Sequence, residues 1–295
     1  MGETCGSSPH LRETARMSDE SALETAIRIG AMIDADDVDM VLVTGSAARG
    51  LSDRSSDIDL HVYGPGQADA APSMHGALAA SGASLVFGVP TPVGRFEKFR
   101  LADRYLDVEQ VDSTVLEAVA ERVQIAKIER GDIKIAAGLR DAVAVSGAAT
   151  LATWNERLAL TDRVAVAEVG RLGRDLLPPR AIRELTWERS DPLSYAARIS
   201  AVLLAGVGLL GVVNRQWIPV HDPKWIPWQV ERLALRPDDV IERITDAVSH
   251  PTDRSMDAAT DMLEEILDLV DEHIDGADTR APRFALGLRT RPSDS

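Results

Sequence analysis

The chain has 295 residues, of which 45% are apolar and 27% charged, and 47 acidic side chains against 32 basic ones give it a formal net charge of -15. This composition excludes a wholly disordered chain, and the length suggests two domains of about 150 residues each. A chain this negative repels nucleic-acid phosphates, which argues against DNA and RNA as partners. The single cysteine, Cys5, excludes a disulfide framework and a cysteine-based zinc site.

Both ends of the chain are polar, and their apolar residues do not recur at the spacing of a helix or a strand. Residues 1–20 contain no apolar signal region, so we expect a disordered leader and a cytoplasmic protein with no membrane partner. Residues 277–295 mix proline, arginine, aspartate and serine, which predicts a flexible tail. The longest apolar run, over residues 199–213, is shorter than the roughly 20 residues of a membrane span, so we expect a buried core helix there.

The first part of the chain alternates strand patterns with glycine-bearing turns. An amphipathic helix is predicted over residues 21–33. Short apolar or alternating runs predict strands at residues 39–44, 57–63, 84–89 and 105–111.

After residue 113 the apolar side chains recur at helical spacing. Three apolar stripes predict helices within residues 115–125, 158–172 and 262–274. We therefore expect an α+β fold class, in which a domain that contains the strands precedes an all-helical domain.

The most informative segment begins where the first predicted strand ends. Gly45 and Ser46 follow that strand, and backbone N–H groups in such a turn, together with the serine hydroxyl, can hold phosphate oxygens. Asp57 and Asp59 are two residues apart on the next strand, so their carboxylates point to one face. Two carboxylates this close are stable when a divalent cation lies between them or, alternatively, when both are solvated at an edge strand.

This pattern resembles the signature of the DNA polymerase β-type nucleotidyltransferase superfamily, in particular its minor and antibiotic-type members with a helical C-terminal domain. The family has a third carboxylate on a later strand, for which Asp107 is the best match and Glu109, on the same strand face, the alternative. The resemblance covers residues 39–111. It implies a small mixed β-sheet catalytic domain over residues 21–112 and a helical substrate-binding domain over residues 113–276.

The resemblance also implies a reaction, the transfer of a nucleoside monophosphate from a nucleoside triphosphate to a hydroxyl, with release of pyrophosphate. AMP from ATP is the expected case. Phosphoryl transfer depends on positioning and charge neutralisation, which two Mg²⁺ ions about 3.5–4 Å apart can provide. Asp57 and Asp59 are expected to bind both ions. Asp107 is expected to bind the ion beside the acceptor and to act as general base, while Gly45 and Ser46 hold the β- and γ-phosphates.

Further polar residues have two interpretations each. Arg49 flanks the Gly-Ser turn and either grips a triphosphate oxygen or is a surface arginine. Lys224 lies in a tryptophan-rich stretch that resembles a helical-domain segment of bacterial minor nucleotidyltransferases, which implies a nucleotide-phosphate ligand; the alternative is stacking on Trp225 or Trp228. His61 shares the strand face of the two aspartates and either contacts metal or substrate or is a partly buried strand histidine.

Three classes of function remain open. The first is modification of a small hydroxyl-bearing molecule, such as an aminoglycoside-like cation whose ammonium groups would meet carboxylates such as Glu109. The second is modification of a macromolecule, either protein AMPylation or tRNA end modification, and the charge of -15 argues against tRNA. The third is a non-catalytic nucleotide-binding regulator, against which the presence of all three expected acids counts.

Overall fold

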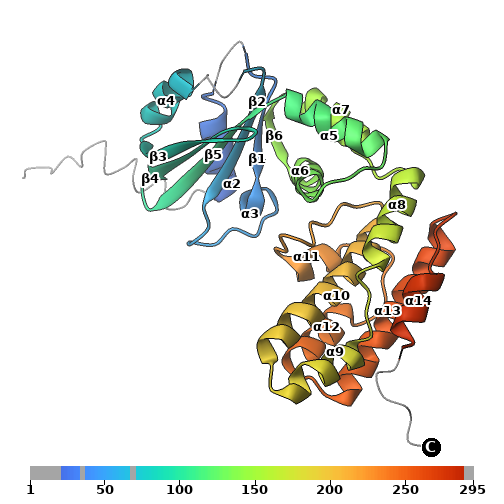
Figure 1. Ribbon diagram of the computed structural model, residues 1–295. Coiled ribbons are helices and arrows are strands. Elements are labelled where there is room, and N and C mark those ends of the chain that lie inside the picture. Colours follow the sequence, from blue (N-terminus) through green and yellow to red (C-terminus); the bar gives the residue numbers. More distant parts are fainter. Residues whose placement is uncertain (1–20, 34–36, 67–70, 289–295) are drawn as a thin grey trace, which may run out of the picture. The chain divides into compact units, whose positions relative to one another are not determined.

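The computed structural model describes residues 21–33, 37–66 and 71–288, which fold as two compact units (Figure 1). The first unit consists of Met1–Ala120 and Gly138–Arg157, and the second of Glu121–Ala137 and Leu158–Ser295. The leader expected over residues 1–20 lies outside the described residues. The expected domain ranges, as functional assignments, stay a prediction.

The first unit is built on a six-stranded mixed sheet with the strand order β3-β4-β5-β2-β1-β6. β2 and β5 pair in parallel, and the other neighbours pair antiparallel. This arrangement confirms the expected small mixed sheet. The strands are β1 (Met40–Thr44), β2 (Ile58–Gly64), β3 (Ser84–Thr91), β4 (Gly94–Leu101), β5 (Arg104–Asp112) and β6 (Val143–Ser146).

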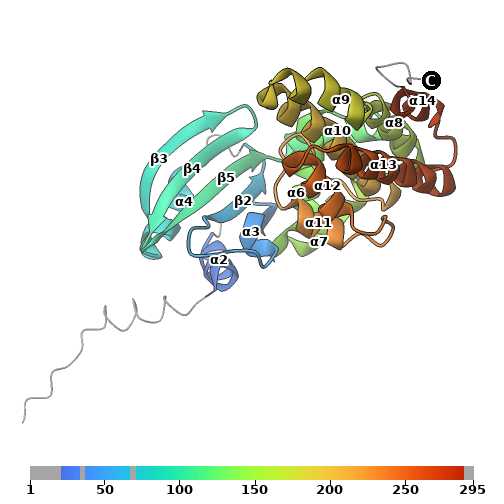
Figure 2. The ribbon, with the colours of Figure 1, turned by 90° about the horizontal axis from the view of Figure 1, so that it is seen from below.

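Two helices pack on one face of this sheet, α2 (Ala22–Gly30) and α4 (Ala71–Ala80) (Figures 1 and 2). Ile29 of α2 and Leu78 of α4 share one apolar core with Leu60 of β2 and Val108 of β5. Because side chains alternate along a strand, the residues between these core positions point to the opposite face. That opposite face carries the predicted carboxylates.

Two strands were missing from the sequence prediction. β4 places Phe99 and Leu101 in the core, but the charged side chains elsewhere in this strand hide the alternation of apolar and polar residues. β6 lies in the part that was expected to be all-helical, and that expectation is wrong there. Its four residues complete the sheet, since Val143 pairs with Val43 of β1.

The remaining helices connect and build the second unit. Short helix α3 (Gly45–Ala48) follows β1, and α5 (Thr114–Gln124) and α6 (Arg130–Asp141) each run from one unit into the other. α7 (Ala148–Arg157) closes the first unit. The second unit contains α8 (Asp162–Gly173), α9 (Pro179–Leu185), the 3-10 turn Trp187–Arg189, α10 (Pro192–Val213), α11 (Ile226–Glu231), α12 (Val240–Ser249), α13 (Asp253–His273) and α14 (Arg280–Leu286).

Helix α10 is the centre of the second unit and contacts α8, α9, α12 and α13. Among the described residues it is the one helix long and apolar enough to cross a membrane, and 67% of its apolar window is buried within the protein. Gly206 permits the close approach of α13, because a Cβ there would lie 2.6 Å from a methyl group of Leu263. The prediction of a core helix is therefore confirmed.

The tail expected from residue 277 is helical over Arg280–Leu286, and residues 289–295 lie outside the described part. Pro282 and Leu286 are buried, and Pro282 packs on α8 where Gly173 leaves room. Arg283 binds the carboxylates of Asp268 and Asp271 of α13, each at 2.7 Å. Two apolar contacts four residues apart therefore fix a segment whose composition predicted flexibility.

Candidate active site

The register of the sheet brings two of the predicted carboxylates together. Asp59 of β2 stands opposite Asp107 of β5, and the same row continues to Thr44 of β1 and Lys98 of β4. Neighbours in one row of a sheet point to the same face. Asp59 and Asp107 therefore share the face that the core helices leave uncovered.

Lys98 connects the third carboxylate to this row. Its ammonium Nζ lies 2.8 Å from Oδ2 of Asp57, which directly precedes β2, and 2.8 Å from Oδ1 of Asp107. One cation thus bridges two of the three predicted metal ligands. We call Asp57, Asp59, Asp107 and Lys98 the aspartate cluster.

The charges of the cluster change the pKa values of its members. Burial raises the pKa of the Asp107 carboxyl, and the nearby Asp57 adds to this effect, whereas Lys98 opposes it. Burial lowers the pKa of Lys98, but its hydrogen bonds to Asp107 and Asp57 outweigh the burial and raise the pKa above its usual value. Lys98 is therefore a permanent positive charge near neutral pH.

Carboxylate oxygens are the ligands that Mg²⁺ prefers, so the donor types in the cluster fit the expected ions. In the part of the chain that the structure describes, however, no three or more histidine, cysteine or acidic side chains are arranged to hold one metal ion. The ammonium of Lys98 lies between Asp57 and Asp107, where a cation would have to bind both. Metal binding at this site thus requires that Lys98 move away.

The glycine turn lies directly against the cluster. Gly45 has a φ of +65°, and a Cβ at this position would collide with the carboxylate of Asp59. Ser46 follows, and its hydroxyl lies 3.1 Å from the hydroxyl of Ser52. The turn that was predicted to hold phosphates is therefore in contact with one predicted metal ligand, and only glycine fits at its first position.

Glu109 belongs to a different row of the sheet. It stands opposite His61, and its Oε2 lies 3.4 Å from Nε2 of that half-buried histidine. The other ring nitrogen of His61 lies 3.5 Å from the hydroxyl of Tyr63, whose pKa is raised by burial and by the charge of Glu109. Because Asp107 stands opposite Asp59 and contacts Lys98, it is better placed than Glu109 to complete the cluster.

Arg49 is engaged in an ion pair. Its Nε lies 2.9 Å from Oδ2 of Asp141, which Arg140 also binds, and its side chain is 16% exposed. These contacts attach the segment after α3 to the end of α6. The predicted role of Arg49 as a phosphate ligand stays a prediction.

Lys224 lies in the second unit, in the loop before α11. Its side chain is exposed, and its carbonyl accepts a hydrogen bond of 2.7 Å from Nε2 of Gln229. The cation stacked on Trp228 is Arg232, with its guanidinium carbon 4.4 Å from the ring centroid. The proposed contact of Lys224 with nucleotide phosphates stays a prediction.

Sequence reasoning missed Lys98. The signal that could have found it is the alternation in β4, where Phe99 and Leu101 mark the core face and leave Lys98 and Arg100 on the other. Lys98 is also one of only four lysines in the chain. Its two carboxylate partners, however, depend on the pairing of β4 with β5, which no local pattern reveals.

Comparison with known proteins finds one family model that matches this chain. Residues 30–137 match the family model described as a nucleotidyltransferase domain, and this range contains the whole aspartate cluster and the glycine turn. A comparison with curated proteins finds no match. One solved structure with similarity is a nucleotidyltransferase-like protein from Exiguobacterium sibiricum 255-15, at 13% identity and a TM-score of 0.35, over 85% of this chain and 74% of the other.

Proposed function

We propose that this chain, whose residues 30–137 match a nucleotidyltransferase domain, is an enzyme of the DNA polymerase β type that transfers AMP from ATP to a hydroxyl group of a small molecule and releases pyrophosphate. The observation that carries the proposal is the aspartate cluster, in which Asp59 and Asp107 stand opposite each other and Asp57 reaches the same lysine as Asp107. The glycine turn against Asp59 supplies an adjacent place for phosphates.

Each carboxylate has a proposed role. Asp57 and Asp59 hold two divalent cations, and Asp107 holds the one beside the acceptor. Mg²⁺ bound there would activate the attacking hydroxyl and neutralise the charge of the leaving pyrophosphate. Asp107 is also proposed to accept the proton of the acceptor hydroxyl.

Lys98 has the proposed role of an internal counter-ion. Without it, Asp57 and Asp107 would repel each other across a partly buried site. Its ammonium keeps the two carboxylates in place until cations bind. Once a cation displaces this ammonium, the flexible four-carbon side chain of Lys98 is free to contact a phosphate oxygen.

The nucleotide is proposed to bind through the glycine turn and Arg49 of the first unit. Backbone N–H groups of Gly45 and Ser46, with the Ser46 hydroxyl, would hold the β- and γ-phosphates. Arg49 would offset part of the negative charge of the triphosphate, and it would have to release Asp141 to do so.

The proposed acceptor is a cation with a free hydroxyl. The chain's net charge of -15 attracts cations, and Glu109 on the uncovered face of the sheet offers a carboxylate to an ammonium group. A second candidate, the AMPylation of a protein, is favoured by edge strand β3, whose Leu85, Val86 and Phe87 are each more than 40% exposed. Exposed apolar edge strands are a common docking place for another chain.

One assay separates these candidates. The protein is incubated with Mg²⁺ and each of the four NTPs labelled at the α-phosphate, together with aminoglycoside-type cations or with cell-lysate protein. Label on the small molecule, with ATP as the donor, supports the proposal, and label on protein supports the second candidate. The absence of any pyrophosphate release in all arms would refute both. Asp103→Ala, at an exposed turn of the same unit, is the matched control for Asp57→Ala.

A further inference from the structure

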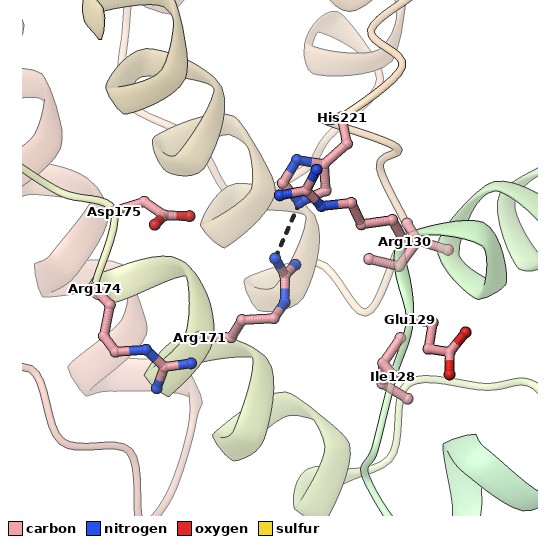
Figure 3. A pocket seen from close by; sticks show the side chains of 8 residues that line it. Ile128, Glu129, Arg130, Arg171, Arg174, Asp175 and His221 are labelled. Carbon is pink, nitrogen blue, oxygen red and sulfur yellow. Dashed lines mark hydrogen bonds between the residues drawn. The ribbon is translucent and has the colours of Figure 1, made fainter.

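The second unit contains a cavity of about 400 Å³ whose polar lining is mainly basic. Three segments form it, namely the start of α6 with the residues before it, the end of α8 with the residues after it, and the loop before α11 (Figure 3). The charged and polar residues of its lining are Glu129, Arg130, Arg171, Arg174, Asp175 and His221. Three arginines and two acids line it, and one of the arginines, Arg171, is paired with the buried acid Glu168 beneath the lining.

Arg171 is fixed in this cavity by a buried partner. Its Nε and Nη2 lie 3.0 Å and 2.6 Å from the oxygens of Glu168, which is only 4% exposed. Its remaining nitrogen, Nη1, lies 3.2 Å from Nε2 of His221 (Figure 3). Because a guanidinium can only donate, His221 accepts at Nε2 and is neutral in this contact.

Arg130 and Arg174 are different, because within the described residues neither side chain forms an ion pair or a hydrogen bond. Other arginines of the same unit, such as Arg122 and Arg243, bind carboxylates at 2.6 Å. Figure 3 shows Arg130 beside His221 and Arg174 beside Asp175, around the same opening as Arg171. Two exposed arginines therefore line the cavity without a hydrogen-bond partner in the described part of the protein.

The positive charge in the cavity affects His221. Burial lowers the pKa of its imidazole, and the charges of Arg130 and Arg171 lower it further, against the opposing charges of Asp175 and Glu168. Glu168 balances the charge of Arg171, whereas Arg130 and Arg174 form no ion pair within the described residues. An anion in the cavity would balance their charge, and phosphate oxygens match the planar fork of a guanidinium.

We propose that this cavity binds the phosphate group of a small hydroxyl-bearing molecule, at a site of the second unit distinct from the aspartate cluster of the first. Arg130, Arg171 and Arg174 hold the phosphate, and the carboxylates of Glu129 and Asp175 accept hydrogen bonds from hydroxyl groups of the same ligand. The volume is within the usual range for small-molecule sites. Arg130 and His221 also line adjoining cavities of about 550 Å³ and about 240 Å³, which leave room for the rest of the ligand.

Calorimetric titration of the full chain tests this site with four probes, which are inorganic phosphate, glucose 6-phosphate, glucose and ATP without divalent metal. We expect saturable binding of glucose 6-phosphate and none of glucose. The double variant Arg130→Gln/Arg174→Gln should weaken the binding of glucose 6-phosphate by about tenfold or more, because it removes two charged donors. Arg254→Gln, at an exposed arginine of the same unit outside the cavity, should leave it unchanged.

The outcomes separate the possible sources of the phosphate. Tighter binding of glucose 6-phosphate than of inorganic phosphate, with the difference lost in Asp175→Asn, supports a phosphate ester as the ligand. Equal binding of the two overturns the hydroxyl contacts and leaves a site for free phosphate. Binding of ATP that persists in Asp57→Ala but is lost in the double arginine variant places a nucleotide phosphate in the cavity. If no probe saturates, or if the arginine variant binds as the wild type does, the site does not exist.

Discussion

The aspartate cluster of the first unit and the arginine cavity of the second both gather charge, but they differ in how that charge is balanced. In the cluster, the single ammonium of Lys98 bridges Asp57 and Asp107 at 2.8 Å each. In the cavity, Arg130 and Arg174 have no carboxylate partner among the described residues. A ligand of the cluster must therefore displace the ammonium of Lys98, whereas a ligand of the cavity would supply a counter-ion for Arg130 and Arg174.

The largest expected effect concerns the identity of the third carboxylate. Asp107→Asn should lower nucleotidyl transfer by about 10³-fold or more, because it removes a side chain proposed both as a metal ligand and as the base. Glu109→Gln is the matched change two residues along the same strand and should cost far less, since Glu109 faces His61. Rates of pyrophosphate release from the two variants decide this. A larger loss in Glu109→Gln would reverse the assignment.

The glycine turn is tested by two alanine substitutions with the same backbone strain. Gly45 and Gly82 have φ values of +65° and +85°, but a Cβ collides with the Asp59 carboxylate at the first position and meets nothing within 4 Å at the second. Both variants should lose about 1–2 kcal/mol of unfolding free energy from the strained backbone. Only Gly45→Ala should also lose activity, by about 10²-fold, because Asp59 is pushed aside. Chemical denaturation and transfer rates measure the two effects, and equal activity of the two variants would contradict the role of the turn.

A smaller effect, on stability, is expected when Lys98 is replaced. It tests whether the cluster, unlike the cavity, holds its own counter-ion. Lys98→Met should reduce the unfolding free energy by about 1–2 kcal/mol without divalent metal, since it exposes Asp57 and Asp107 to each other and solvent screens part of that repulsion. Mg²⁺ should restore the stability, because it replaces the lost positive charge. Arg100→Met, on the same face of β4, is the control. Thermal melts with and without Mg²⁺ test this, and a loss that Mg²⁺ does not repair would show that Lys98 is not a counter-ion.

The smallest effect is the titration of His221. Its folded pKa lies below the ordinary 6.5, so between these two values the unfolded chain binds more protons and the stability of the fold falls as the pH falls. Arg130→Gln should raise this pKa, and so should a bound phosphate ester. NMR titration of the imidazole signals measures both shifts. A pKa that stays the same in the variant would show that Arg130 does not act on His221.

Local patterns were sufficient for most of the first unit. The alternation in β2 and β5 put Asp59 and Asp107 on strands, and the Gly45-Ser46 turn after β1 indicated a site beside them. The partner of those acids was not visible, because Lys98 reaches them only through the register of β4 with β5. β4 itself was missed since charged residues alternate with its core residues.

The arginine cavity had no signal in the sequence at all. Its lining comes from three segments, near residues 130, 171 and 221, which only the packing of the second unit brings together. Arg171 and Arg174 look like ordinary surface residues of a helix end until Glu168 is seen to be buried beneath Arg171. Helix α14 was missed for a similar reason, because its Pro282 packs on α8 and its Arg283 binds carboxylates of α13.

The most direct test of the aspartate cluster is the number of Mn²⁺ ions bound in the presence of a non-hydrolysable ATP analogue, measured by electron paramagnetic resonance. Mn²⁺ takes the same oxygen ligands as Mg²⁺ and can report its site. The wild-type protein should bind two ions for each chain, and Asp57→Ala should bind at most one, with Asp103→Ala equal to the wild type. Equal Mn²⁺ binding by the wild type and Asp57→Ala would contradict the proposed two-metal site.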